Sequence, residues 1–169
     1  MLSLVRPTLA MKDAVLAYRQ AHFDHGEMGI DGSERLGRTP RYEDWLARVT
    51  ANADPAAVYP GWVLTDTFLA MDDGEIVGII DLRHELKGDL CDYGHCGYSV
   101  RPDLRRRGYA TQMLRLVLDV ARAAGMTEVT VTAERSNTAS VRTIEKCGGT
   151  LLRTFEYDSQ PADVYRIAL

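Results

Sequence analysis

Apolar residues recur at spacings of three and four between residues 105 and 124, in the longest amphipathic stretch of the chain. This period places them on one face of a helix, and Gly125 directly after the stretch is typical of a helix end. Similar spacing predicts helices over residues 8–25, 42–53 and 137–147. Four helices are therefore expected.

Strands are expected where apolar and β-branched residues alternate with polar ones or form short runs. The clearest pair, residues 62–71 and 75–86, is joined by Asp72-Asp73-Gly74, a sequence typical of a hairpin turn. The other predicted strands are a short one before Pro7 and residues 93–100, 128–133, 151–157 and 164–169. This order predicts one α/β or α+β domain over residues 1–169, with helices covering a mixed sheet.

Composition and charge exclude several classes of protein. The 169 residues are 46% hydrophobic and 26% charged, which is typical of a folded protein. The net charge is −4, so the chain lacks the positive field that holds nucleic acid. The three cysteines form no C-x-x-C pair, which indicates neither a metal site nor a disulfide framework. No apolar run has the length of a signal peptide or a membrane span, which favours the cytoplasm.

One short segment is basic against this acidic background. Arg101, Arg105, Arg106 and Arg107 place four positive charges within seven residues, just where a predicted strand turns into the long helix. The first turn of a helix has unpaired N–H groups and a partial positive charge, and Gly108 allows close approach to the backbone. The segment contains neither a dinucleotide-binding G-x-G-x-x-G nor a G-K-[ST] ending. It therefore predicts a site for a small anion of another kind.

Two motifs in this region resemble those of the GNAT superfamily of N-acetyltransferases. Arg105, Gly108 and Ala110 match R/Q-x-x-G-x-G/A, and one strand later Asn137 is followed by lysine-x-glycine at Lys146. Their order and intervening elements agree with the family over residues 75–155. The resemblance implies a mostly antiparallel mixed sheet, acetyl-CoA as donor, no metal, and direct acetyl transfer to a primary amine without an acetyl-enzyme.

The resemblance also implies which residues bind acetyl-CoA. Main-chain groups at Tyr98, Ser99 and Val100 would pair with the pantetheine arm as an added strand does. The residues expected around the pyrophosphate are Arg105, Arg106, Arg107, Gly108, Tyr109, Ala110 and Thr111. Asn137 and Ser140 would border the same cofactor.

The catalytic groups are less well defined by the sequence. Asp92, His95 and Glu134 are candidates for the base, because they flank the two strands that part around the acetyl group in the family. Many GNAT enzymes have tyrosine seven residues after the motif asparagine, where this chain has Ile144. Tyr98, Tyr157 or water could protonate the leaving thiolate instead. Cys96 is expected to pack in the core.

The acceptor is expected to bind near the polar loop of residues 26–39. Its charged residues, with the histidine just before it, are His25, Glu27, Asp31, Glu34, Arg35 and Arg38. Their acidic surplus favours a cationic acceptor, and both small-molecule amines and protein amines stay open. A non-catalytic acyl-CoA sensor or interaction module on the same fold is the alternative function. The oligomeric state is open, a homodimer included.

Overall fold

The computed structural model describes residues 1–169 and contains two antiparallel sheets. The first has the order β1-β2-β3-β4 and the second has the order β5-β7-β6. The strands are β1 (Ser3–Val5), β2 (Thr65–Asp72), β3 (Glu75–Arg83), β4 (Tyr98–Val100), β5 (Glu128–Glu134), β6 (Thr150–Tyr157) and β7 (Gln160–Ala168). The predicted α/β fold with antiparallel strands flanked by helices is confirmed, but the single mixed sheet that was expected is divided into two sheets, each of them antiparallel.

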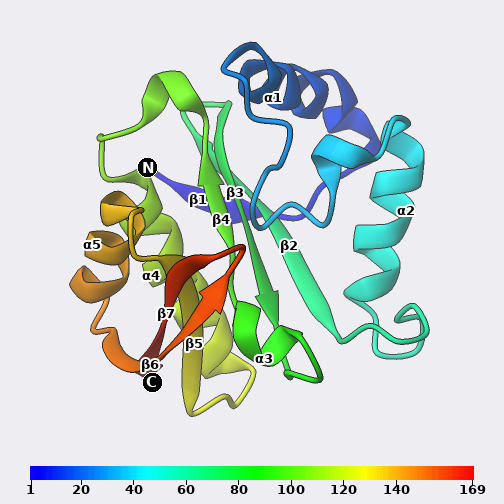
Figure 1. Cartoon of the computed structure of the whole chain (residues 1–169). Coiled ribbons are helices and arrows are strands. Elements are labelled where there is room, and N and C mark those ends of the chain that lie inside the picture. The colour runs from blue at the N-terminus through cyan, green and yellow to red at the C-terminus, as the bar shows by residue number, and fades with distance from the viewer.

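The helices lie on both sides of the first sheet, with α1 and α2 on one side and α4 and α5 on the other (Figure 1). They are α1 (Lys12–Asp24), α2 (Tyr42–Asn52), α3 (Leu90–Tyr93), α4 (Tyr109–Ala123) and α5 (Thr138–Lys146), with short 3₁₀ turns at Leu9–Met11, Leu36–Arg38 and Pro102–Leu104. None of them is both long enough and apolar enough to cross a bilayer.

Each side of the first sheet has its own hydrophobic core. Trp45 of α2 is fully buried against α1 and the sheet, in a cluster that includes Ile79 of β3. On the other side, Met113 of α4 and Ile144 of α5 are fully buried in a larger cluster that includes Ile80 and residues of the second sheet. Adjacent residues of β3 thus enter opposite cores, as the alternation of a strand requires.

The two sheets are joined at a single short crossing. Gly94 forms an isolated bridge with Val131, and the His95 N–H donates to the Thr130 carbonyl at 2.8 Å. Gly94 has φ 81° and ψ −177°, a backbone region that only glycine occupies readily, and a Cβ there would lie 2.6 Å from the Thr130 carbonyl oxygen. This crossing therefore depends on glycine.

Beyond the crossing, β4 pairs with β3 and diverges from β5. The Gly97 carbonyl accepts a hydrogen bond from β3 at 3.1 Å, and the Arg101 N–H donates to β3 at 2.9 Å. Because the backbone groups of an antiparallel strand alternate in direction, those of Tyr98 and Val100 face away from β3 and toward the gap before β5. The fold thus leaves one edge of β4 without a partner strand.

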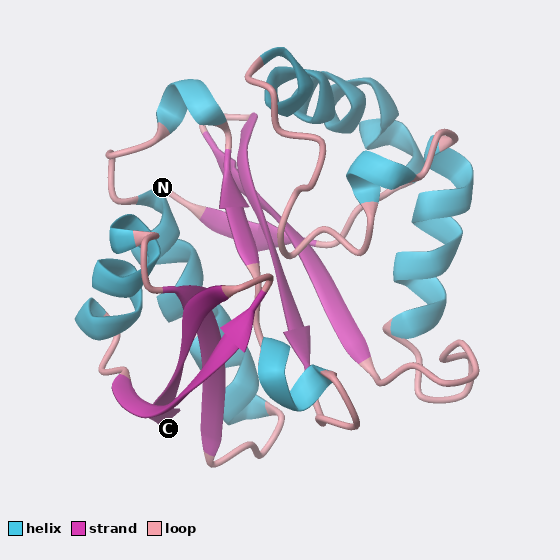
Figure 2. Cartoon of the chain, viewed as in Figure 1, coloured by secondary structure: helices cyan, strands magenta, loops and turns pink.

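The segment after α1 runs as a loop beside β4 (Figure 2). Ser99 Oγ donates to the Asp31 carbonyl at 2.9 Å, and Trp45 Nε1 donates to the Ser33 carbonyl at 2.7 Å. A Cβ on Gly32 would lie only 2.1 Å from the Gly97 carbonyl oxygen, so glycine lets the loop contact the strand directly. These contacts hold the loop against β4.

Several predicted boundaries were wrong for identifiable reasons. The helix expected from residue 105 begins at Tyr109, because Arg106 takes a left-handed conformation with φ 64° that cannot continue a helix. The strand expected over 93–100 is shortened to Tyr98–Val100, and the unpredicted helix α3 precedes it. The strands expected over 62–71 and 75–86 run instead over Thr65–Asp72 and Glu75–Arg83.

Replacing the glycine at the crossing tests its role in the fold. We expect Gly94→Ala to lower the free energy of unfolding by on the order of 3 kcal/mol, because alanine is disfavoured in this backbone region and meets the Thr130 carbonyl. Gly88→Ala is the matched control: Gly88 has φ 56° but nothing lies within 4 Å of its added Cβ. It should cost only about 1 kcal/mol. Urea unfolding measures both, and equal losses would contradict the account.

Candidate active site

A cleft of about 1010 Å³ opens where β4 and β5 diverge. Its walls come from β4, β5, the start of α4, α5, the loop after α1, and the β6–β7 hairpin. It therefore includes the unpaired edge of β4. One end lies at the first turn of α4 and the other between the α1 loop and the β6–β7 hairpin.

The start of α4 presents unpaired backbone donors to this cleft. Gly108 is the N-cap residue with φ 82°, and no side chain caps the helix. The first helical N–H with a backbone acceptor is that of Gln112, which donates to the Gly108 carbonyl at 3.1 Å. The N–H groups of Tyr109, Ala110 and Thr111 are thus left without helical partners, the usual state of a helix start. An anion could accept hydrogen bonds from all of them.

Space in front of these donors is open. The nearest atom to a Cβ built on Gly108 is the Gln112 side-chain nitrogen, at 4.0 Å. Arg106 lines the cleft and has no ion-pair partner, whereas Arg107 lies outside the cleft lining. The left-handed backbone at Arg106 is strained for a non-glycine residue, and such strain is common at ligand-binding turns. The turn therefore fits a phosphate group.

Arg105 lines the cleft and is bound by a carboxylate of the loop after α1. Its guanidinium binds both carboxylate oxygens of Glu27, at 2.7 and 2.6 Å, and Glu27 also accepts from His22 Nδ1 at 2.9 Å. The hydrogen bond from Arg105 lowers the pKa of Glu27 to about 2, so this carboxylate is ionised at neutral pH. Arg105 thus connects the phosphate turn to the α1 loop.

Helix α5 forms the opposite wall of the cleft. The Asn137 side chain caps this helix by accepting from the Ser140 N–H at 3.1 Å, and the Ser140 hydroxyl lies 2.8 Å from the Tyr98 hydroxyl. Burial raises the pKa of Tyr98, so the phenol stays protonated at neutral pH. Tyr98 therefore bridges β4 and α5 inside the cleft.

Two cations on α5 were not among the cofactor-binding residues expected from the sequence. Arg142 and Lys146 both line the cleft, and neither is part of an ion pair. They lie one turn apart on the same helix face, and this spacing after Asn137 was the available signal. Together with Arg106 they make the end of the cleft at the first turn of α4 positive.

Two of the candidate bases do not line the cleft. Asp92 accepts from the Arg153 guanidinium at 2.6 Å, because α3 and the turn at Gly94 direct it toward β6. His95 Nδ1 accepts the Thr130 N–H at 2.9 Å, and burial lowers the pKa of this imidazole. Asp92 is thus bound to β6 and His95 to β5.

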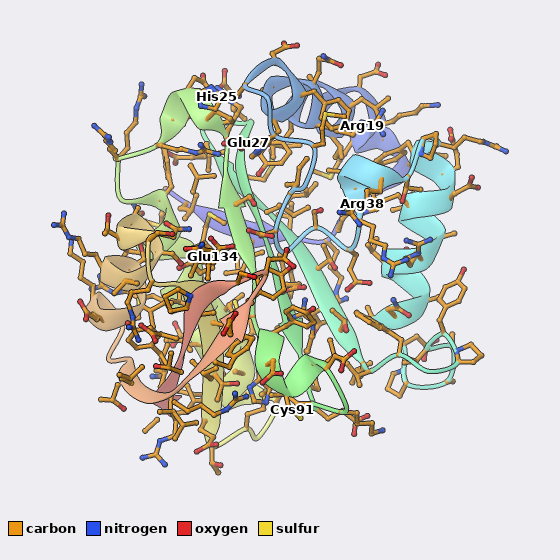
Figure 3. The ribbon with its side chains drawn as sticks, in the orientation of Figure 1. Arg19, His25, Glu27, Arg38, Cys91 and Glu134 are labelled. Carbon is orange, nitrogen blue, oxygen red and sulfur yellow. The ribbon has the colours of Figure 1, made fainter.

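Glu134 does line the cleft, and in Figure 3 it lies between α5 and β4. It ends β5, is exposed and has no ion-pair partner. Asp31 lines the same end of the cleft from the α1 loop, also without an ion pair. From the sequence, Asp31 was expected near the acceptor and was not among the catalytic candidates.

The other charged residues of the acceptor loop are divided between the cleft and the rest of the molecule. Glu27 lines the cleft but is bound by Arg105, and Glu34 is buried where Asn52 donates to it at 3.0 Å. Three more lie outside the cleft lining, namely His25, Arg35 and Arg38. Asp31 is therefore the only carboxylate of this loop that is both unpaired and in the cleft.

Cys96 and Ile144 are both buried in the core. Cys96 is 1% exposed, and burial raises the pKa of its thiol well above the ordinary value, so it is not a thiolate nucleophile. Ile144 is fully buried in the core. No group of three or more His, Cys, Asp or Glu side chains is arranged to hold a metal ion.

Comparisons with known proteins identify the family. The chain matches the model of the acetyltransferase (GNAT) domain over residues 11–150. A search of curated proteins gives no match.

Solved structures share the fold at low sequence identity. The microcin C7 self-immunity acetyltransferase MccE, in complex with acetyl-CoA and AMP, is 11% identical with a TM-score of 0.75, over 99% of this chain and 92% of MccE. Mycobacterium smegmatis RimJ, in complex with CoA-disulfide, is 20% identical with a TM-score of 0.75, over 99% and 81% of the two chains. AAC(6')-Ib, in complex with ribostamycin and coenzyme A, is 18% identical with a TM-score of 0.64, over 99% and 92%.

The family model covers most of the chain, and the cleft contains the features that the resemblance implied, an unpaired strand edge beside a glycine-containing helix start. The chain therefore belongs to the GNAT acetyltransferase family and is an acetyl-CoA-dependent acyltransferase.

Proposed function

We propose that this protein transfers the acetyl group of acetyl-CoA directly to a primary amine. The observation that carries the proposal is the charge distribution of one continuous cleft. Its cofactor end has three unpaired cations, Arg106, Arg142 and Lys146, and its other end has the unpaired carboxylates Asp31 and Glu134. An anionic donor and a cationic acceptor would bind at opposite ends, with the β4 edge between them.

Acetyl-CoA fits the positive end and the β4 edge. The N–H groups of residues 109–111 and the guanidinium of Arg106 would hold its pyrophosphate. Backbone groups of Tyr98 and Val100 would pair with the pantetheine arm as with an added strand. When bound, acetyl-CoA supplies a thioester whose acetyl carbon bonds to the amine nitrogen as the carbon–sulfur bond breaks.

The residues of the chain manage the protons of this reaction. An alkylammonium has a pKa of about 10, so a carboxylate at the acceptor end must first take one proton from it. Tyr98 would give its hydroxyl proton to the departing sulfur and regain one from solvent. The second proton lost by the nitrogen also passes to solvent. Binding both partners in one cleft supplies much of the acceleration by proximity.

Tyr98 is suited to this task by its position. Its hydroxyl is held by Ser140 at 2.8 Å inside the cleft, on the strand whose edge would hold the pantetheine arm. It would replace the tyrosine that many family members have seven residues after the motif asparagine, where this chain has the buried Ile144. Its raised pKa keeps the proton available at neutral pH.

One feature favours a second function. Ile144 removes the usual tyrosine hydroxyl, so a chain that binds acetyl-CoA as a sensor without rapid turnover is the alternative. Incubation with acetyl-CoA and a panel of primary amines, with free thiol measured over time, separates the two. We expect amine-dependent thiol release. Saturable acetyl-CoA binding without release for any amine would favour the sensor.

Blocking the phosphate turn tests the cofactor site. Gly108→Glu should weaken coenzyme A binding by about 100-fold, or about 2.8 kcal/mol. The reason is that a side chain and a negative charge would enter the space for the phosphate. Gly125→Glu is the control, since Gly125 has a similar φ of 81° at the far end of the same helix. Calorimetry of both variants measures the difference. Equal affinities in the two folded variants would contradict this assignment.

Removing the Tyr98 hydroxyl tests the proton donor. Tyr98→Phe should reduce kcat by about 100-fold and leave the coenzyme A affinity within about twofold, because the hydroxyl acts on the leaving sulfur rather than on the bound cofactor. Tyr42→Phe removes a hydroxyl that donates to the Thr8 carbonyl at 2.6 Å on the other side of the sheet. Steady-state rates that fall equally in both variants would rule out a specific role for Tyr98.

A further inference from the structure

The acceptor end of the cleft contains two carboxylates that no protein cation neutralises. Asp31 and Glu134 reach it from different walls, and neither forms an ion pair. The other acids nearby are engaged, since Glu27 is bound by Arg105 and the buried Asp81 is bound by Arg83 at 2.9 Å. Two negative charges are therefore available to a ligand in this part of the cleft.

Asp31 is fixed beside the reacting strand. The hydrogen bond from Ser99 Oγ to its carbonyl and the close contact of Gly32 with Gly97 hold its backbone against β4. The backbone groups at the unpaired edge of β4, where the pantetheine arm would lie, belong to Tyr98 and Val100, the residues directly before and after Ser99. A carboxylate held by backbone contacts at this strand can take a proton at a defined place.

Glu134 is placed for a different task. It is the last residue of β5 and is exposed, whereas Asp31 lines the cleft from the loop after α1. No hydrogen bond fixes its side chain. A carboxylate without such restraints can form an ion pair with a second cationic group of the acceptor, a few bonds from the reacting nitrogen.

Aromatic side chains line the same end. Tyr93 and Tyr157 both line the cleft, with ring centroids 6.0 Å apart and an interplanar angle of 84°. The neighbouring Tyr93 is the largest cause of the raised pKa of Tyr157, and the carboxylates of Asp31 and Glu134 raise this pKa by smaller amounts. Aromatic faces beside carboxylates favour an organic cation.

The charges around Asp31 come from four elements. Burial contributes most to its raised pKa, and the carboxylates of Glu134 and Glu27 raise it further. Arg83 of β3 and His22 of α1 act in the opposite direction. A cation bound between Asp31 and Glu134 would relieve this repulsion.

We infer that Asp31 and Glu134 form a two-point site for an acceptor with two positive charges, in which Asp31 accepts the proton of the reacting ammonium and Glu134 binds the second cation. This inference rests on the proposed acetyl transfer and names its substrate class as diamines or polyamines. The first ammonium gives one proton to Asp31 and then, as the nitrogen bonds to the acetyl carbon, a second proton to solvent. The second ammonium keeps its protons throughout.

Binding without turnover tests the two-point site. Calorimetric titration of the protein saturated with coenzyme A should show that 1,4-diaminobutane binds at least tenfold tighter than butylamine, which lacks the second charge. Glu134→Gln should remove this difference. Glu128→Gln, at the other end of β5 and outside the cleft, is the matched control and should retain it. A diamine preference that survives Glu134→Gln, or no preference in the natural protein, would overturn the inference.

Kinetics separate the roles of the two carboxylates. With acetyl-CoA, Asp31→Asn should lower kcat by about 100-fold for both amines and abolish the fall in rate on the acidic side of the pH profile. Glu134→Gln should instead raise KM for the diamine. An Asp31→Asn variant with the natural pH profile and kcat would remove the assignment of Asp31.

Different experimental outcomes would contradict acetyl transfer and the two-point site. Release of thiol with the same kcat/KM for monoamines and diamines would leave acetyl transfer intact and overturn the two-point site. Tight diamine binding that depends on Glu134, without thiol release from any amine, would support the site and overturn the transferase. The combined experiments therefore assign any failure to one of the two.

Discussion

The divergence of β4 from β5 is the constraint on which the rest of the structure depends. Backbone contacts join the two sheets at Gly94 and His95, where a glycine-specific backbone lets the chain approach β5 before β4 begins. Beyond this point β4 keeps its pairing with β3 and leaves its other edge unpaired. Unpaired backbone groups are costly unless water or a ligand satisfies them, so this edge is a ready site for an extended ligand.

The Arg105–Glu27 pair connects the two ends of the cleft. Glu27 lies in the loop that also carries Asp31, and Arg105 lies in the turn that precedes α4. The bidentate geometry is one of the stronger forms of charge pairing, and His22 adds a third group on the same carboxylate. The loop after α1 is thereby attached to the turn before α4 as well as to β4, so the cleft is preorganised.

The sequence predicted those parts of the site that depend on local pattern. Gly108 at a helix start and the order of strands and helices follow from spacing and turn chemistry, and both are present in the structure. Long-range partners could not be predicted in the same way. Arg105 pairs with a residue 78 positions away, and Asp92 is turned toward Arg153 by a four-residue helix too short to show a period. Asp31 was recognisable only as one charge among several, because its place in the cleft depends on the contact of Gly32 with Gly97.

Hydrogen exchange of the backbone amides with and without acetyl-CoA tests the central claim most directly. The account predicts that bound acetyl-CoA slows exchange at residues 109–111 and at Tyr98 and Val100, because these amides have no protein acceptor and would gain one from the ligand. Protection confined to other parts of the chain, or no protection at saturating acetyl-CoA, would contradict it.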